Sequence, residues 1–141
     1  MPISACETLD LPRSLLVILR MEAEMRRDDD YIRELMLELE ACDEWVIFFQ
    51  LLDDSDAVAT RRYYHLRLLA DAGFLEETGR HSGNFRITNS GHDFLGLIRD
   101  DTIWGKTRHA VSHLGGASLQ MLSTVAEAYL RQGLAKLGVP L

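Results

Sequence analysis

The chain has 141 residues, of which 47% are hydrophobic, and a formal net charge of −7 at pH 7. This length predicts one domain, or one domain with an appended helix, and the hydrophobic content excludes a disordered protein. Cys6 and Cys42 have no metal-ligand spacing. They are typical of reduced thiols in a protein that needs no disulfide.

Charge and hydropathy indicate where the protein resides and which partners it can bind. No stretch approaches the ~20 apolar residues of a membrane span. No basic region precedes the short apolar run at residues 15–19, so we expect no signal peptide and a cytoplasmic protein. Residues 1–56 carry 15 acidic and 5 basic side chains, whereas residues 57–141 carry 7 and 10. The charge of residues 1–56 therefore disfavours binding of nucleic acid, whereas that of residues 57–141 does not.

Residues 1–25 form a predicted N-terminal extension, with a helix beginning near Leu11-Pro12-Arg13. Met25-Arg26-Arg27 resembles a second translation start, so whether residues 1–24 belong to the working protein is left open.

The next segment has the pattern of an amphipathic helix. Asp28-Asp29-Asp30 places negative charge where a helix N-terminus favours it. The apolar residues that follow have the i, i+3, i+4, i+7 spacing of one helix face: Ile32, Leu35, Met36 and Leu39. Trp45–Phe49 is rich in Val, Ile and Phe, which predicts a buried strand.

A second helix is predicted over residues 57–72, capped by Ser55 or Asp56. Its inward side would carry Val58, Arg62, Leu66, Leu69 and Gly73, with the Arg62 stem buried, and Gly73 would end it in the left-handed conformation. Residues 74–78 and 85–88 then read as paired strands around a polar tip at residues 79–84.

Three helices follow. Asn89 or Ser90 would cap one over residues 91–99, with Phe94, Leu95 and Ile98 inward. Asp101 or Thr102 would cap another, which ends at Gly115-Gly116. The last, over residues 118–137, carries an apolar stripe: Leu119, Leu122, Val125 or Ala126, Tyr129, Gly133 and Leu137. This stripe could pack on the domain or pair with a second copy, and both readings stay open.

The segment Tyr64–Leu75 resembles the third helix and first wing strand of winged-helix regulators. It carries the H-L-x-x-L pattern at His65-Leu66, ends at Ala72-Gly73 and runs directly into a strand. The two leucines would face the core, and Gly73 would permit the sharp exit.

A wider set of strings resembles an uncharacterised family of small bacterial, phage and prophage proteins with a predicted winged helix. The strings are Arg26-Arg27-Asp28, Ile32-Arg33-Glu34-Leu35, Tyr64-His65-Leu66, Ala72-Gly73, Thr88, Gly91-His92-Asp93-Phe94-Leu95 and Ile98-Arg99-Asp100-Asp101-Thr102-Ile103-Trp104. The resemblance covers about residues 26–137. It implies a mainly α fold with a small β-hairpin: a winged-helix domain over residues 26–100 and a helical extension over residues 101–141.

The preferred functional hypothesis is a non-catalytic, regulator-like protein of phage or prophage type that binds duplex DNA, with a homodimer through the last helix. The candidate DNA contacts are Thr60, Arg61, Tyr64 and Arg67 on the outer face of the 57–72 helix, and Arg80 at the wing tip. One departure matters: only residues 43–56 lie between the two predicted helices and most of them look like strand, so the helix that normally precedes a recognition helix must be very short or missing. The alternative is a protein–protein interaction module that uses the acidic N-terminal half or the helix face bearing Leu68.

Signals of catalysis are weak, and we expect neither an enzyme nor a cofactor or metal. His109 and His113 have i, i+4 spacing but no glutamate between them and no evident third ligand. Asp100 and Asp101 are adjacent and do not face each other as an acid–base pair would. We expect Trp104 to anchor the 102–114 helix on the rest of the domain.

Overall fold

The computed structural model describes residues 26–53 and 55–141, so the predicted extension over residues 1–25 and Cys6 lie outside the described residues. This part of the chain holds five helices and three strands, in the order α2 (Asp29–Glu40), β1 (Ile47–Phe48), α3 (Ala57–Asp71), β2 (Leu75–Glu77), β3 (Asn84–Ile87), α4 (Asn89–Ile98), α5 (Asp101–Ser112) and α6 (Leu119–Lys136). The protein is therefore mainly helical with a small antiparallel sheet, as predicted.

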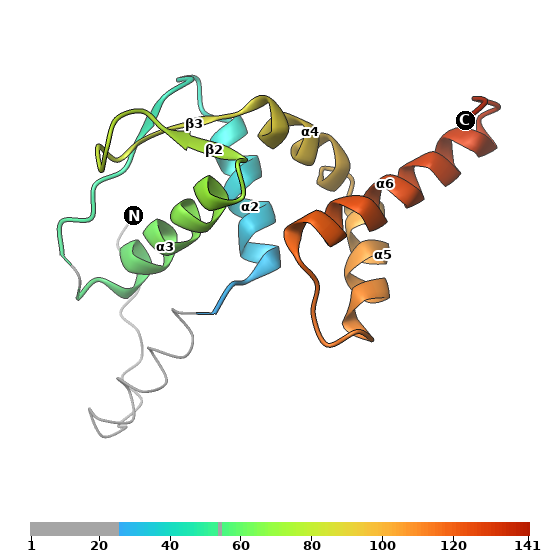
Figure 1. Cartoon of the computed structure of the whole chain (residues 1–141), viewed down its shortest axis with the longest axis horizontal. Helices are drawn as coiled ribbons and strands as arrows, with labels where there is room; N and C mark the ends of the chain where they lie inside the picture. Colours follow the sequence, from blue (N-terminus) through green and yellow to red (C-terminus); the bar gives the residue numbers. More distant parts are fainter. Residues whose placement is uncertain (1–25, 54) are drawn as a thin grey trace.

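The elements form two groups on either side of α2. Figure 1 shows α2 and α3 below the β2–β3 hairpin, and α4 leading away from the sheet toward α5 and α6. The principal partners of α6 are α4 and α5. In Figure 1, α3 and α6 lie on opposite sides of α2.

α2 forms as its sequence pattern predicts. The carboxylate of Asp28 accepts a hydrogen bond from the backbone N–H of Tyr31 at 3.1 Å and caps the helix. All four predicted core residues of α2 are buried: Ile32, Leu35, Met36 and Leu39. They belong to one core that also receives side chains from α3, the sheet, α4, α5 and α6.

α3 and the hairpin also match their predicted places. Asp56, one of the two predicted caps, accepts from the backbone N–H groups of Val58 and Ala59. Gly73 has φ +81°, the left-handed conformation expected at this exit. The sheet order is β1-β3-β2, with both pairs antiparallel and Leu75 opposite Ile87. Leu75 and Phe85 contribute to the core from the two paired strands.

The prediction of a buried strand over Trp45–Phe49 is wrong in length and burial. Only Ile47 and Phe48 form β1, and it hydrogen-bonds to β3 alone at the edge of the sheet. Trp45 is 79% exposed and Phe48 is 62% exposed. The composition favoured a strand correctly, but burial depends on a covering layer that local sequence does not reveal.

Val58 was predicted to face inward on α3 and is 66% exposed instead. It lies in the first turn of the helix, which extends beyond the core. Leu66 and Leu69 are buried as predicted, and His65 is the third buried residue of α3.

Two helix caps differ from the sequence predictions by one residue. Thr88 caps α4, because its hydroxyl accepts from the backbone N–H of Gly91 at 3.0 Å and donates to the Gly73 carbonyl at 2.5 Å. Asp100 caps α5 by accepting from the backbone N–H of Ile103 at 2.9 Å. In both cases the residue just before the predicted cap supplies the oxygen.

α6 is only partly packed. Leu119, Leu122 and Ala126 are buried, whereas Leu137 is 80% exposed. Figure 1 shows the C-terminal half of α6 projecting away from the other elements. The predicted stripe is therefore core over its first half only. None of the described helices has both the length and the apolar character required to cross a membrane.

Candidate nucleic-acid interface

Three of the five predicted contact residues share one face of α3. Thr60, Tyr64 and Arg67 follow at i, i+4 and i+7, and each is half-buried. Arg80 is exposed at the tip of the hairpin between β2 and β3 and makes no ion pair with any described residue. The helix face and the hairpin tip lie on neighbouring elements, since α3 packs against β2.

Arg67 connects this face to the hairpin. Its guanidinium forms an ion pair with the carboxylate of Glu77 at the end of β2. Glu77 is only 12% exposed at its side chain and also accepts from the backbone N–H of Gly83 at 3.0 Å. One carboxylate on β2 thus contacts both α3 and the hairpin loop just before β3. Glu77 was not among the predicted contact residues, although its position after the sharp turn at Gly73 brings it back beside the helix.

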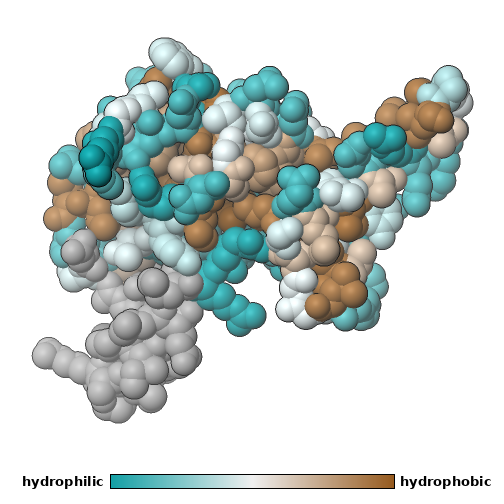
Figure 2. All heavy atoms as spheres, in the orientation of Figure 1, coloured by the Kyte–Doolittle hydropathy of each residue, from teal (hydrophilic) through white to brown (hydrophobic). Residues whose placement is uncertain are grey.

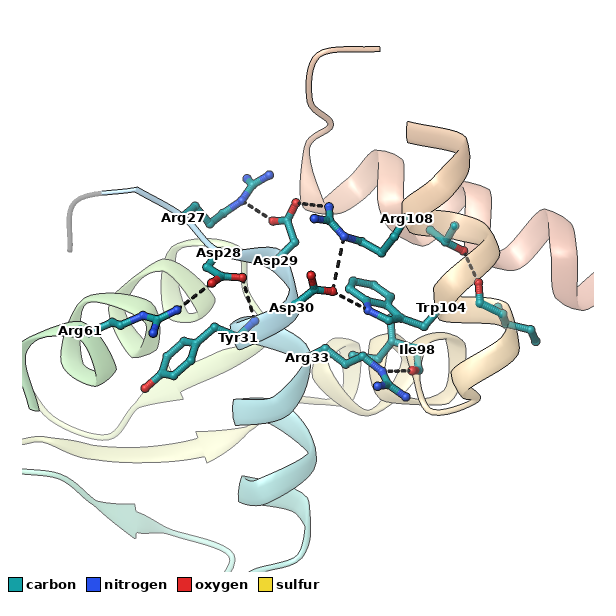
Figure 3. A network of polar contacts seen from close by, with 12 residues as sticks. Arg27, Asp28, Asp29, Asp30, Tyr31, Arg33, Arg61, Ile98, Trp104 and Arg108 are labelled. Atoms are coloured by element: carbon teal, nitrogen blue, oxygen red, sulfur yellow. Dashed lines mark hydrogen bonds and ion pairs between the residues drawn. The ribbon is translucent and has the colours of Figure 1, made fainter. Parts of the chain in front are cut away.

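Arg61 points toward α2 and away from the face of the other candidates. Its guanidinium lies 2.7 Å from Oδ2 of Asp28 and 4.2 Å from the ring centroid of Tyr31 (Figure 3). The ion pair and the cation–π contact hold the first turns of the two helices together. Arg61 therefore lies beside the candidate face and has a structural role there.

His65, one turn further along α3, is fully buried. Its Nε2 atom accepts from the backbone N–H of Asp28 at 3.1 Å, and its Nδ1 atom lies 2.8 Å from the Arg61 carbonyl oxygen. This geometry fits a neutral ring with the proton on Nδ1. Burial lowers the pKa of His65 below its ordinary value of 6.5.

Arg62 keeps its predicted place at the edge of the core. Its guanidinium pairs with the carboxylate of Glu38 on α2 at 2.9 Å. The hydrogen bond to Glu38 raises the pKa of Arg62. Three arginines of α3 thus pair with carboxylates from other elements, and this lowers the positive potential of the helix.

A second polar network joins the first turn of α2 to α5. Figure 3 shows Arg27 and Arg108 reaching the carboxylate of Asp29, at 2.8 and 3.0 Å. The indole N–H of Trp104 donates to Asp30 Oδ1 at 2.8 Å, and Trp104 is buried. The prediction that Trp104 anchors this helix is confirmed.

Arg33 secures the junction between α4 and α5. Its Nε donates to the carbonyl oxygen of Ile98 at 2.7 Å, and its Nη2 donates to the carbonyl oxygen of Arg99 at 3.0 Å. These carbonyls end α4, where a cation is favoured. Asp101 was a candidate cap but pairs with Arg33 at 2.6 Å. The string Ile98–Trp104 of the family resemblance therefore lies at a structural junction.

His109 on α5 and His113, which follows the last residue of this helix, lie close together without a metal-site geometry. The rings of His109 and His113 are 5.1 Å apart between centroids. Within residues 26–53 and 55–141, no three side chains of the His, Cys, Asp and Glu types are grouped as metal ligands would be. Cys42 is exposed with a free thiol.

These features define a small, mainly helical protein in which an arginine-bearing helix lies against a short hairpin. The chain belongs to the family described as "Hypothetical protein (DUF2513)", which it matches over residues 26–118. The family resemblance is thereby confirmed, with a match that ends before the expected residue 137. The chain is 32% identical over 124 residues to an "Uncharacterized protein" of Haemophilus influenzae (strain ATCC 51907 / DSM 11121 / KW20 / Rd), across 79% of this chain and 100% of that relative. No solved structure matches the chain significantly.

Proposed function

We propose that this protein is a non-catalytic, winged-helix DNA-binding protein of the regulator type. The order of elements from α2 to β3 is helix, strand, helix, strand, strand, and the sheet order is β1-β3-β2. In this proposal α3 is the helix that approaches the major groove and the β2–β3 hairpin is the wing. The family resemblance to phage and prophage proteins adds support.

The observation that carries the proposal is the position of this face of α3 beside the hairpin tip. Thr60, Tyr64 and Arg67 line that face, and Arg80 extends the reach of the wing. α6 has its principal contacts on α4 and α5, so it does not occupy this side (Figure 1). Hydroxyl and guanidinium groups at this spacing suit base edges and phosphates.

Two features shape how such a protein would bind. The described residues between α2 and α3 (41–53, 55 and 56) contain β1 and no helix, so this part of the chain offers no counterpart of the preceding helix that normally crosses the DNA backbone. Arg67 is also paired with Glu77. Binding would exchange that carboxylate for a phosphate, and the affinity would depend strongly on salt.

A duplex titration by fluorescence anisotropy at two salt concentrations tests the proposal. The full chain should bind with a steep salt dependence, and Arg67→Ala/Arg80→Ala should weaken binding and reduce the slope by about two phosphate contacts. The matched control is Arg131→Ala/Lys136→Ala on the projecting part of α6, which removes the same charge. Equal affinity of both variants would reject this interface.

A protein-interaction module is the second candidate, and the exposed apolar segment before α3 favours it. Trp45, Phe48, Leu52 and Val58 are all exposed large side chains. Figure 2 shows hydrophobic atoms at the left end of the molecule, where the segment between β1 and α3 runs in Figure 1. A photocrosslinking residue at position 48 would capture a discrete protein in cells in this case, whereas one at position 131 would not.

The proposal also includes a homodimer through α6. The distal half of this helix leaves Leu137 exposed and continues the stripe that is buried nearer its start. Two-fold symmetry would match a palindromic DNA site.

A further inference from the structure

A groove lies between the first turns of α2 and α3 and the loop that follows α5. Its volume is about 1080 Å³. Four arginines line it, together with two aspartates: Arg26, Arg27, Arg61, Arg108, Asp28 and Asp29. The described lining thus has two more positive than negative side chains. Of these four arginines, Arg61 alone was among the predicted contact residues.

The aspartates orient the arginines but do not neutralise all of their positive charge. Asp29 pairs with both Arg27 and Arg108, and Arg108 also lies 3.5 Å from Asp30, so three aspartates face the four arginines. Asp28 receives Arg61. Arg26 is exposed and makes no ion pair with a described residue. Figure 3 shows Arg27, Arg61 and Arg108 converging on the first turn of α2.

The backbone around the groove also suits an anion. The N-terminal end of α2, whose dipole favours negative charge, lines it together with Ala57 and Val58 from the first turn of α3, and Asp28 and Asp56 already cap these two helices. Gly115 and Gly116 form the opposite wall without side chains and have φ values of +74° and +139°. A strand of linked phosphates could therefore approach the arginines closely along this wall.

We infer that this groove binds successive phosphate groups of a polyphosphate chain. In the cell, this polyphosphate would be the sugar–phosphate backbone of the nucleic acid that α3 contacts. The identification of the ligand as nucleic acid rests on the proposed function, because Arg61, which lines the groove, is the neighbour of Thr60 on α3. Arg26 and Arg27 would contact phosphates flanking the bases that face α3, which would offset the missing preceding helix.

Two ligands test the inference on the full chain: inorganic tripolyphosphate by calorimetry, and a 20-base-pair duplex by anisotropy. The variants are Arg26→Ala/Arg27→Ala and, because Arg27 also supports Asp29, Arg26→Glu alone. Arg131→Ala/Lys136→Ala is the charge-matched control for the double variant. Melting temperatures show that each variant is folded.

We expect the wild type to bind both tripolyphosphate and the duplex. Both groove variants should lose at least threefold in affinity for each ligand, and the control variant should lose none. The salt slope for the duplex should fall by about one for each arginine removed. If tripolyphosphate binds in the groove but the duplex does not, the phosphate site stands and the proposed DNA function fails. If tripolyphosphate fails to bind and both groove variants bind the duplex as the wild type does, the inference is overturned while the proposed function stands.

Discussion

The backbone N–H of Asp28 donates a hydrogen bond to Nε2 of the buried His65, with the two atoms 3.1 Å apart. Asp28 also caps α2 with its carboxylate and pairs with Arg61. A single position thus joins the start of α2 to the middle of α3. The contact needs a neutral imidazole, since a protonated Nε2 would turn a second N–H toward that of Asp28.

This contact makes the stability of the fold depend on pH. Burial lowers the pKa of His65 from 6.5, so the unfolded chain takes up a proton at a higher pH than the folded chain does. The free energy of unfolding should therefore be fully retained above pH 6.5 and fall as the pH drops from 6.5 toward the folded-state pKa. The slope from this site approaches about 1.4 kcal/mol per pH unit.

Urea unfolding at pH 7.5 and pH 5.5 measures the effect. The control is His65→Gln, which keeps a polar side chain at this position and does not titrate. Wild type should lose more stability than this variant between the two pH values. Equal losses would show that His65 does not control the dependence.

The elements were predictable where neighbours in the sequence determine them. The stripe of α2, the bounds of α3 and the turn at Gly73 follow from local spacing and from glycine's access to positive φ. The burial of His65 was not predictable, because its partner Asp28 is 37 residues away.

In the candidate site, too, features set by neighbours in the sequence were predictable and contacts with distant residues were not. Helical periodicity placed Thr60, Tyr64 and Arg67 on one face, which agrees with their positions along α3. Periodicity did not reveal that Arg61 turns to Asp28 or that Arg67 pairs with Glu77, since both carboxylates come from other elements. Arg27 and Arg108 converge for the same reason, through an aspartate on α2.

The two tryptophans should contribute very differently to stability. Trp104 is buried and donates to Asp30, whereas Trp45 is largely exposed. Trp104→Ala should cost about 3–5 kcal/mol through the cavity it creates, and Trp45→Ala should cost less than about 0.5 kcal/mol. Circular dichroism during urea unfolding measures both. Similar losses for the two variants would contradict the assigned anchor role of Trp104.

Glu77→Gln should increase DNA affinity. The variant keeps an oxygen that can accept from Gly83 but removes the charge that competes with phosphate for Arg67. Such partly exposed pairs are worth up to about 1 kcal/mol, so the dissociation constant should fall about two- to fivefold. Glu127→Gln on α6, which also pairs with an arginine, is the control and should change nothing. A Glu77→Gln variant that binds DNA less tightly than the wild type would oppose this role.

Self-association should depend on the distal half of α6. Leu130 and Leu137 lie seven residues apart on one side of the helix, and Leu137 is exposed. Sedimentation velocity should show a dimer that Leu130→Asp/Leu137→Asp converts to a monomer, whereas Gln132→Ala leaves it intact. A wild-type chain that stays monomeric at every concentration used for DNA binding would eliminate the α6 dimer.

The central claim is that α3 and the hairpin form a DNA-binding face, and backbone amide chemical-shift mapping tests it most directly. A 15N-labelled full chain is titrated with a 20-base-pair duplex at low salt, then returned to high salt. We expect shifts concentrated at Thr60, Tyr64, Arg67 and Arg80 that reverse with salt. Absence of shifts at low salt, or shifts confined to Trp45–Leu52, would contradict it.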